Sequence, residues 1–165
     1  MPAFRDEYRE KRHRLPRHCY CGNVSVSYHA CVAERRRVFA SGRIVDELVR
    51  QLTDAATRHG CKVRAYCFMP DHLHVIFRGQ TAEADTWAAM FGFKRRSGVW
   101  LSKALGVAWQ KGFYDEILSS GKEADAMVGY ILANPVRKGI VEDWWDYPFN
   151  GPKDEERGRW MLREG

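Results

Sequence analysis

The stretch MPDHLHVIF, residues 69–77, decides the fold of this 165-residue chain. It opens with turn residues and continues with alternating polar and apolar residues, the pattern of a half-buried β-strand. Residues two apart on a strand point to the same face, so His72 and His74 project side by side while the apolar residues between them face the core. A second alternating segment, 62–68, precedes the turn at 69–71. The two segments therefore predict an antiparallel hairpin.

The segments around this hairpin predict the remaining elements. Alternating residues indicate strands at 20–29 and 112–118, and apolar residues at three- and four-residue spacing indicate helices at 44–58, 82–105 (with a break near Gly92 or Gly98) and 122–134. The order is strand, helix, strand, strand, helix, strand, helix. This order predicts the α+β class, with a ferredoxin-like split βαβ antiparallel sheet and an added C-terminal helix.

Composition indicates one globular domain. The hydrophobic content is 45% and the aromatic content 13%, values typical of a chain with a packed core. We expect a single domain at 19–150 between a charged N-terminal arm, 1–18, and a charged C-terminal tail, 151–165. No apolar run reaches the roughly 18 residues that a membrane helix needs, and the charged N-terminus is unlike a secretory signal. These features predict a cytoplasmic protein that does not enter a membrane.

The net charge of +6 and the pI of about 9.2 favour a polyanionic partner, nucleic acid first and a membrane surface second. The five cysteines are an odd number, which argues against a disulfide framework. Cys19 and Cys21 are separated by one residue, unlike the spacing of zinc ribbons, and no second pair follows. Free thiols are the expected state of all five.

The histidine pair predicts a metal site. Two neutral imidazoles on one strand face can hold a divalent metal and leave open positions for a phosphate oxygen. The metal would then act as a Lewis acid. The alternative is a chance pair on an exposed sheet face. Asp71 would point to the opposite face of a regular strand, or cap the turn.

A tyrosine follows far downstream, on the predicted helix 122–134. Tyr130 and Asn134 are four residues apart and would share one face of that helix. A phenol can attack phosphorus when a base, a metal or a positive field assists it, and an amide oxygen is a ligand suited to Mg²⁺ or Mn²⁺. Arg137 and Lys138 could supply the field or hold a DNA backbone. The alternative is a tyrosine that only packs.

Four segments, in order along the chain, resemble the single-tyrosine HUH transposases of the IS-like family, and among them the REP-associated tyrosine transposases. They read MPDHLH (69–74), WQKGFYD (109–115), YILANPVRKGIV (130–141) and DYPF (146–149). The resemblance implies metal-dependent nicking and rejoining of single-stranded hairpin or repeat DNA through a 5′-phosphotyrosine. It implies that Tyr130 is the nucleophile, that His72, His74 and Asn134 bind Mg²⁺ or Mn²⁺, and that the protein is a monomer or homodimer.

The chain departs from the family pattern at two positions where the family often has basic residues, here Glu116 and Ser119. A domesticated relative that binds nucleic acid without efficient cutting is therefore an alternative. A small metal-binding regulatory domain of the same fold is another. In either DNA-related reading, phosphate contacts are predicted for three basic groups. These are Arg35, Arg36 and Arg37; Lys94, Arg95 and Arg96; and Arg137 with Lys138.

Overall fold

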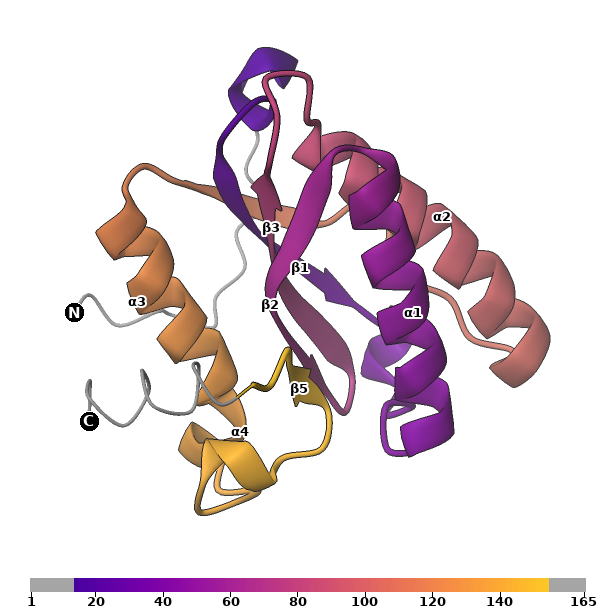
Figure 1. Cartoon of the computed structure of the whole chain (residues 1–165). Helices are drawn as coiled ribbons and strands as arrows, with labels where there is room; N and C mark the ends of the chain where they lie inside the picture. The colour runs from indigo at the N-terminus through magenta and orange to yellow at the C-terminus, as the bar shows by residue number, and fades with distance from the viewer. Residues whose placement is uncertain (1–13, 155–165) are drawn as a thin grey trace.

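The computed structural model describes residues 14–154, which contain every element discussed below (Figure 1). The strands are β1 (Ser25–Cys31), β2 (Cys61–Met69), β3 (His72–Gly79), β4 (Tyr114–Leu118) and β5 (Asn150–Gly151), and the α-helices are α1 (Gly42–Arg58), α2 (Thr86–Leu105), α3 (Gly121–Leu132) and α4 (Asn134–Arg137). Short 3-10 turns lie at Arg17–Tyr20, Ala33–Arg35 and Trp144–Asp146. Most of the predicted arm, 1–18, and of the predicted tail, 151–165, lies outside the described residues.

The five strands form one antiparallel sheet in the order β4-β1-β3-β2-β5. Helix α1 connects β1 to β2, and β3 lies between these two strands. The α+β class and the antiparallel sheet are thus confirmed. The two-residue strand β5, which pairs with β2 at the edge, was not predicted because such a short segment carries no alternation.

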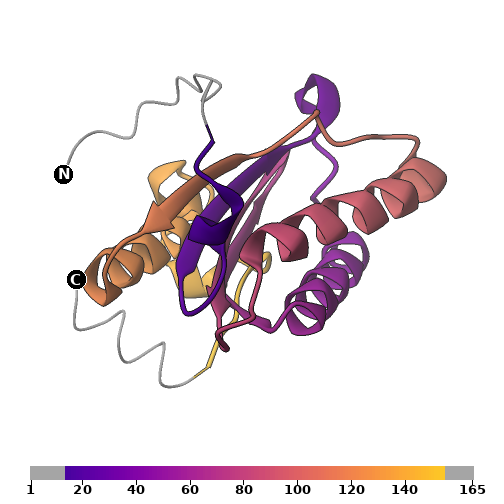
Figure 2. The same ribbon diagram turned by 90° about the horizontal axis from the view of Figure 1, so that it is seen from above.

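Helices cover both faces of the sheet (Figures 1 and 2). On one face, α1 and α2 bury a large core that includes Leu73, Val75 and Phe77 of β3. On the other face, α3 packs on a smaller core that includes Ile76. The alternation along β3 therefore places its odd-numbered apolar residues under α1 and α2, as predicted. The even-numbered positions, with His72 and His74, belong to the face of α3 and α4.

Two predicted boundaries were wrong at the start of an element. The first strand begins at Ser25, not at residue 20, because Tyr20 ends a 3-10 turn and its buried hydroxyl donates to Asp115, 2.6 Å away. Helix α2 begins at Thr86, not at residue 82, because the Asp85 side chain accepts from the backbone N–H of Ala88 (2.9 Å) and caps the helix.

The predicted break in α2 is absent. The helix continues through both glycines, although each costs about 1 kcal/mol relative to alanine. Burial of Met90, Phe93 and Leu101 along the same helix outweighs that cost, since a fully buried large apolar side chain contributes about 1.5–3 kcal/mol.

The predicted helix 122–134 is divided in two. Helix α3 ends at Leu132, and α4 begins at Asn134 with Pro135 in its first turn. Proline has no N–H to donate to the carbonyl four residues earlier but fits the first turn of a helix, so it ends one helix and starts the next. Tyr130 and Asn134 therefore lie on two helices and not on successive turns of one.

All five cysteines are free thiols, as predicted, and Cys31, Cys61 and Cys67 are buried. Across residues 14–154, no helix combines the length and the apolar character that crossing a membrane requires.

Candidate metal centre

Three histidines meet on the α3 face of the sheet. His72 and His74 come from β3, and His29 comes from the neighbouring strand β1, where it is the direct antiparallel partner of His74. One nitrogen from each ring lies within 4.8 Å of the other two. The rings of His29 and His74 are stacked with centroids 4.3 Å apart, and the ring of His72 meets both edge-on. This is a donor set that can hold a transition-metal ion.

The sequence indicated only two of these histidines. His29 lies in the predicted strand 20–29, but the strand pattern does not tell which strand pairs with β3 or in which register. The sequence did offer one signal, because His29 follows Tyr28 and neighbouring residues of a strand point to opposite faces. Tyr28 is fully buried under α2, so His29 points to the other face of the sheet.

Burial keeps the three imidazoles neutral, which is the form that binds metals. Burial lowers the pKa of His74 to about 3, and the charge of His72 and the cations Arg137 and Arg35 add to this effect. The pKa of His29 is lowered still further, first by burial and then by His74 and His72. Burial also lowers the pKa of His72, against the opposing influence of Asp71. At neutral pH all three rings therefore have nitrogen lone pairs to offer.

Asp71 orients His72. The expectation that this aspartate faces away from the pair or only caps the turn was wrong: its Oδ1 lies 2.6 Å from Nδ1 of His72, and its Oδ2 accepts from Nε of Arg35 at 3.0 Å. Burial tends to raise the pKa of the Asp71 carboxyl, but the bond from His72 and the charge of Arg35 outweigh it, so that the pKa lies below its usual value. An ionised carboxylate only accepts, so Nδ1 carries the proton and Nε2 is left for a metal.

Tyr130 lies beneath a guanidinium. The Cζ of Arg137 is 3.6 Å from the centroid of the Tyr130 ring, and Nη2 of the same arginine donates to Oδ1 of Asn134 at 3.3 Å. Asn134 is buried and Tyr130 is half-buried. One arginine thus links the two helices that the proline separates. Tyr130 packs against the core that includes Ile76 of β3, so it lies on the same side of the sheet as His72 and His74.

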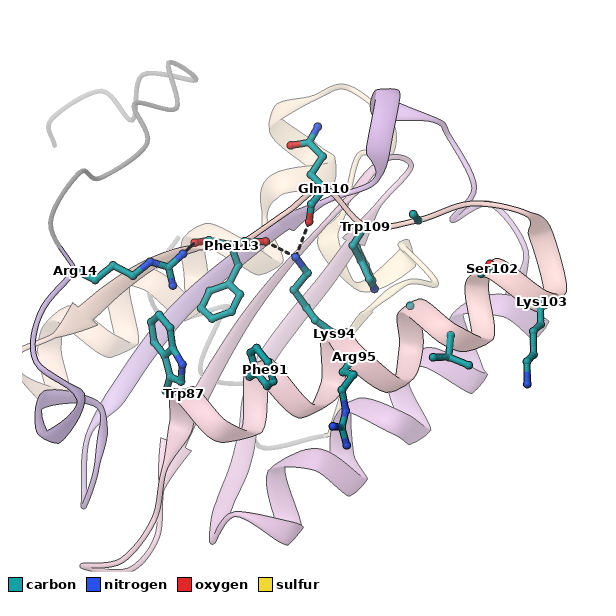
Figure 3. Close-up of a pocket in the computed structure, with 14 residues that line it drawn as sticks. Arg14, Trp87, Phe91, Lys94, Arg95, Ser102, Lys103, Trp109, Gln110 and Phe113 are labelled. Carbon is teal, nitrogen blue, oxygen red and sulfur yellow. Dashed lines mark hydrogen bonds between the residues drawn. The ribbon is translucent and has the colours of Figure 1, made fainter.

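The predicted basic groups separate in space. Arg35, Arg137 and Lys138 act on the histidines electrostatically, whereas Arg36 and Arg37 are exposed beyond the end of β1. On α2, Lys94 and Arg95 line a pocket on the outer side of the helix, with a volume of about 730 Å³ (Figure 3). Arg96 instead turns toward α1 and pairs with Asp54 at 2.9 Å.

The two departures from the family pattern lie on β4 and just after it. Glu116 is a half-buried residue of β4. Ser119 binds the Glu123 carboxylate through its backbone N–H (2.8 Å) and its hydroxyl (2.6 Å), and Ser120 caps α3 by accepting from the backbone N–H of Glu123. A serine here therefore stabilises the start of α3.

Fold and site together define an α+β protein with a histidine-based candidate metal centre and a helical tyrosine on the same face of the sheet. The sequence model of the family "Transposase IS200 like" matches residues 23–134, more than half of the chain. The chain belongs to this family of IS200-like transposases, and the resemblance noted in the sequence is confirmed.

Individual proteins agree with this assignment. The REP-associated tyrosine transposase of Escherichia coli (strain K12) is 26% identical over 104 residues, which span 61% of this chain and 61% of the relative. A solved structure of a REP-associated tyrosine transposase, bound to a REP hairpin, has a TM-score of 0.68 at 19% identity, covering 84% of this chain and 80% of the other. A candidate transposase from Deinococcus radiodurans R1 has a TM-score of 0.51 at 18% identity, covering 73% and 93%.

Proposed function

We propose that this protein nicks single-stranded hairpin or repeat DNA and transfers the strand, as a transposase with a tyrosine nucleophile. Oη of Tyr130 attacks the phosphorus, and the bond from phosphorus to the 3′ oxygen breaks. The phenol loses its proton and the departing 3′ oxygen gains one, which leaves a 5′-phosphotyrosine and a 3′ hydroxyl. Attack by a later 3′ hydroxyl reverses the step without ATP.

The observation that carries this proposal is the position of Arg137, between Tyr130 and Asn134 and close enough to act on His74. The guanidinium over the ring lies where it can donate hydrogen bonds to a phosphate oxygen. Together with Lys138 it creates a positive field where the negative charge of the attacked phosphate increases. A tyrosine that only packs in the core does not require positive charges around it.

In this proposal a divalent ion, Mg²⁺ or Mn²⁺, is held by His72, His74 and Asn134. The neutral imidazoles and the bond from Asp71 to His72 fit that role, and His29 adds a third imidazole. Three nitrogen donors also suit zinc. When bound, the ion supplies Lewis-acid assistance at the scissile phosphate.

In the same proposal, the sheet, helix α3 and the basic residues near the site each have a role in catalysis or DNA binding. The ferredoxin-like split βαβ sheet of the 19–150 domain carries the ligands, and the added helix α3 carries the nucleophile. Arg35, Arg36, Arg37, Arg137 and Lys138 hold the DNA backbone at this site. A hairpin substrate is supported by the relative solved with a REP hairpin. The protein would act as a monomer or homodimer on DNA in the bacterial cytoplasm.

The test is covalent capture of DNA. Labelled single-stranded hairpins from repeats near the gene are incubated with the protein and Mn²⁺ and separated on a denaturing gel. We expect a slow covalent band that Tyr130→Phe abolishes while hairpin affinity is unchanged. Tyr114→Phe is the matched control, because the ring of Tyr114 lies 6.0 Å from that of His29 on the same side of the sheet. A band that persists in Tyr130→Phe and is lost in Tyr114→Phe would contradict the assignment.

A second candidate is a domesticated protein that binds hairpin DNA or RNA with weakened cutting. The observation in its favour is the acidic Glu116 and the uncharged Ser119 where the family often has basic residues. Hairpin binding without a covalent band, across several hairpins and metals, is the result that this candidate predicts.

A further inference from the structure

A buried cysteine lies directly beside the histidine cluster. Cys31 follows His29 by two residues on β1, so the two side chains point to the same face of the sheet. Cys31 is the antiparallel partner of His72, as His29 is the partner of His74. The Sγ atom of Cys31 lies 3.6 Å from Nε2 of His29. Two adjacent strands therefore bring one thiol and three imidazoles together in a compact block.

The contact between the thiol and His29 has the spacing of two ligands on one zinc ion. Zinc binds sulfur at about 2.3 Å and nitrogen at about 2.0–2.1 Å, so a tetrahedral ion holds these two atoms roughly 3.6 Å apart. Two nitrogens on such an ion are roughly 3.4 Å apart. The three imidazole nitrogens lie within 4.8 Å of one another. Rotation about side-chain bonds, for the thiol as for the rings, is the movement that would bring all four onto one ion.

Arg35 supports a charged sulfur at this position. Its Nη1 donates to Sγ of Cys31 at 3.0 Å, and its Nε donates to the Asp71 carboxylate that is bonded to His72. Burial raises the pKa of the Cys31 thiol and Arg35 acts against that effect, so we expect the proton to leave when a metal binds. The resulting thiolate brings a negative charge to a buried divalent ion, which three neutral imidazoles cannot supply.

Sulfur also selects the kind of ion. Thiolate and imidazole ligands suit Zn²⁺, whereas Mg²⁺ and Mn²⁺ prefer oxygen ligands. Four protein ligands complete the tetrahedral shell of zinc and leave no position for a phosphate oxygen, as in structural zinc sites. A hard ion held by His72, His74 and Asn134 does not require the thiol and keeps positions open. The identity of the ion would therefore decide whether the site accepts DNA.

We propose that Cys31 is a metal ligand and that this protein has a second mode of metal binding, in which Zn²⁺ is held by Cys31, His29, His72 and His74 and the site is closed to DNA. The zinc site follows from the block of four side chains. Its effect on cleavage rests on the proposed function. The competing explanation of the 3.6 Å contact is a hydrogen bond between the His29 ring and the thiol, with no sulfur on the metal.

The test uses Co²⁺, which occupies tetrahedral zinc sites and absorbs light. Co²⁺ is added to the reduced, metal-free, full-length protein and the absorption spectrum is recorded. We expect one equivalent to produce the visible bands of a tetrahedral ion together with a near-ultraviolet charge-transfer band from thiolate to cobalt, and Zn²⁺ to abolish both. Imidazole ligands do not produce the thiolate band. Visible bands without it in the original protein would overturn the proposal, whatever the variants do.

Two variants identify the sulfur. Cys31→Ser should lose the thiolate band and bind Zn²⁺ roughly 70- to 900-fold more weakly in competition with a chelator, a loss equal to a quarter of the free energy of a four-ligand zinc site. Cys67→Ser is the matched control, because Cys67 is a buried thiol on the same face and the direct partner of His74. A band kept in Cys31→Ser and lost in Cys67→Ser would overturn the proposal. Urea midpoints establish that both variants fold.

The effect on DNA is measured separately. One equivalent of Zn²⁺ should suppress the covalent band that the original protein forms with hairpin DNA and Mn²⁺. If zinc binds through Cys31 and the covalent band is unchanged, closure of the site is refuted. If the thiolate band is present but no hairpin gives a covalent band with Mn²⁺, the nuclease assignment fails and the zinc site stands. A covalent band in a protein without the thiolate band gives the opposite conclusion.

Discussion

The Asp71→Asn variant tests whether the carboxylate behind His72 supports a metal ion. In the structure Oδ1 of Asp71 lies 2.6 Å from Nδ1 of His72, and the two side chains are only 22% and 12% exposed. The amide of asparagine can still accept this bond but has no charge. It also leaves Arg35 without its carboxylate partner at 3.0 Å.

The expected loss of metal-binding free energy in Asp71→Asn follows from the difference between two kinds of hydrogen bond. A bond to a charged group contributes about 1.5–3 kcal/mol and one between neutral groups about 1 kcal/mol, so the loss is about 0.5–2 kcal/mol, or roughly 2- to 30-fold in affinity. Losing a residue that supports a metal ligand typically weakens binding about 10- to 100-fold. The two ranges overlap at about 10- to 30-fold.

The assay is titration of the metal-free protein with Mn²⁺ by calorimetry. We expect the dissociation constant to rise about 10- to 30-fold in Asp71→Asn and binding to vanish in His72→Ala. Asp54→Asn is the matched control, because Asp54 also pairs with arginines but lies far from the histidines, on α1. An affinity for Mn²⁺ in Asp71→Asn within twofold of that of Asp54→Asn would refute the reasoning.

Three further changes have distinct expected results. Arg137→Ala and Arg137→Lys should both slow covalent product formation at saturating DNA by about tenfold or more, because lysine lacks the planar guanidinium that lies over the Tyr130 ring and also donates to Asn134. A normal single-turnover rate in Arg137→Lys would contradict this. Tyr147→Phe removes a buried 2.6 Å bond to the carbonyl of Phe68 and should lower the free energy of unfolding by about 1 kcal/mol, seen as a lower urea midpoint. Burial lowers the pKa of Lys94 from 10.5 to about 8, so between these pH values the unfolded chain holds more protons and the free energy of unfolding rises with pH. The Lys94→Met variant lacks this contribution. In urea titrations between about pH 8 and 10.5, the difference in the free energy of unfolding between the two proteins should therefore change with pH. A difference that stays constant would contradict the lowered pKa of Lys94.

Local elements were largely predictable. The helix predicted at 44–58 is α1, Gly42–Arg58, and the hairpin predicted around 69–71 is formed by β2 and β3. These elements depend on the periodicity of neighbouring residues and on turn chemistry, which any short window of sequence contains. The unpredicted ends, such as Ser25 and Thr86, depend on side chains that bind distant or capping partners.

The candidate site was predictable only in part. His72 and His74 share a face because of their spacing alone. Pro135 was visible in the sequence, but the sequence did not show that it places Tyr130 and Asn134 on different helices. Tyr130 and Asn134 are both contacted by Arg137 across the helix break, and they do not share one helix face.

By itself, the sequence determined the α+β class, the side-by-side histidines, the tyrosine segment and membership of a transposase family, because periodicity and motifs are properties of neighbouring residues. Only the tertiary structure decided that His29 joins the cluster, that Asp71 supports His72 and that α2 and the segment 108–113 enclose a pocket. These contacts depend on which strands pair and in which register. That choice is made by the packing of the whole core, to which residues far apart in the chain contribute together.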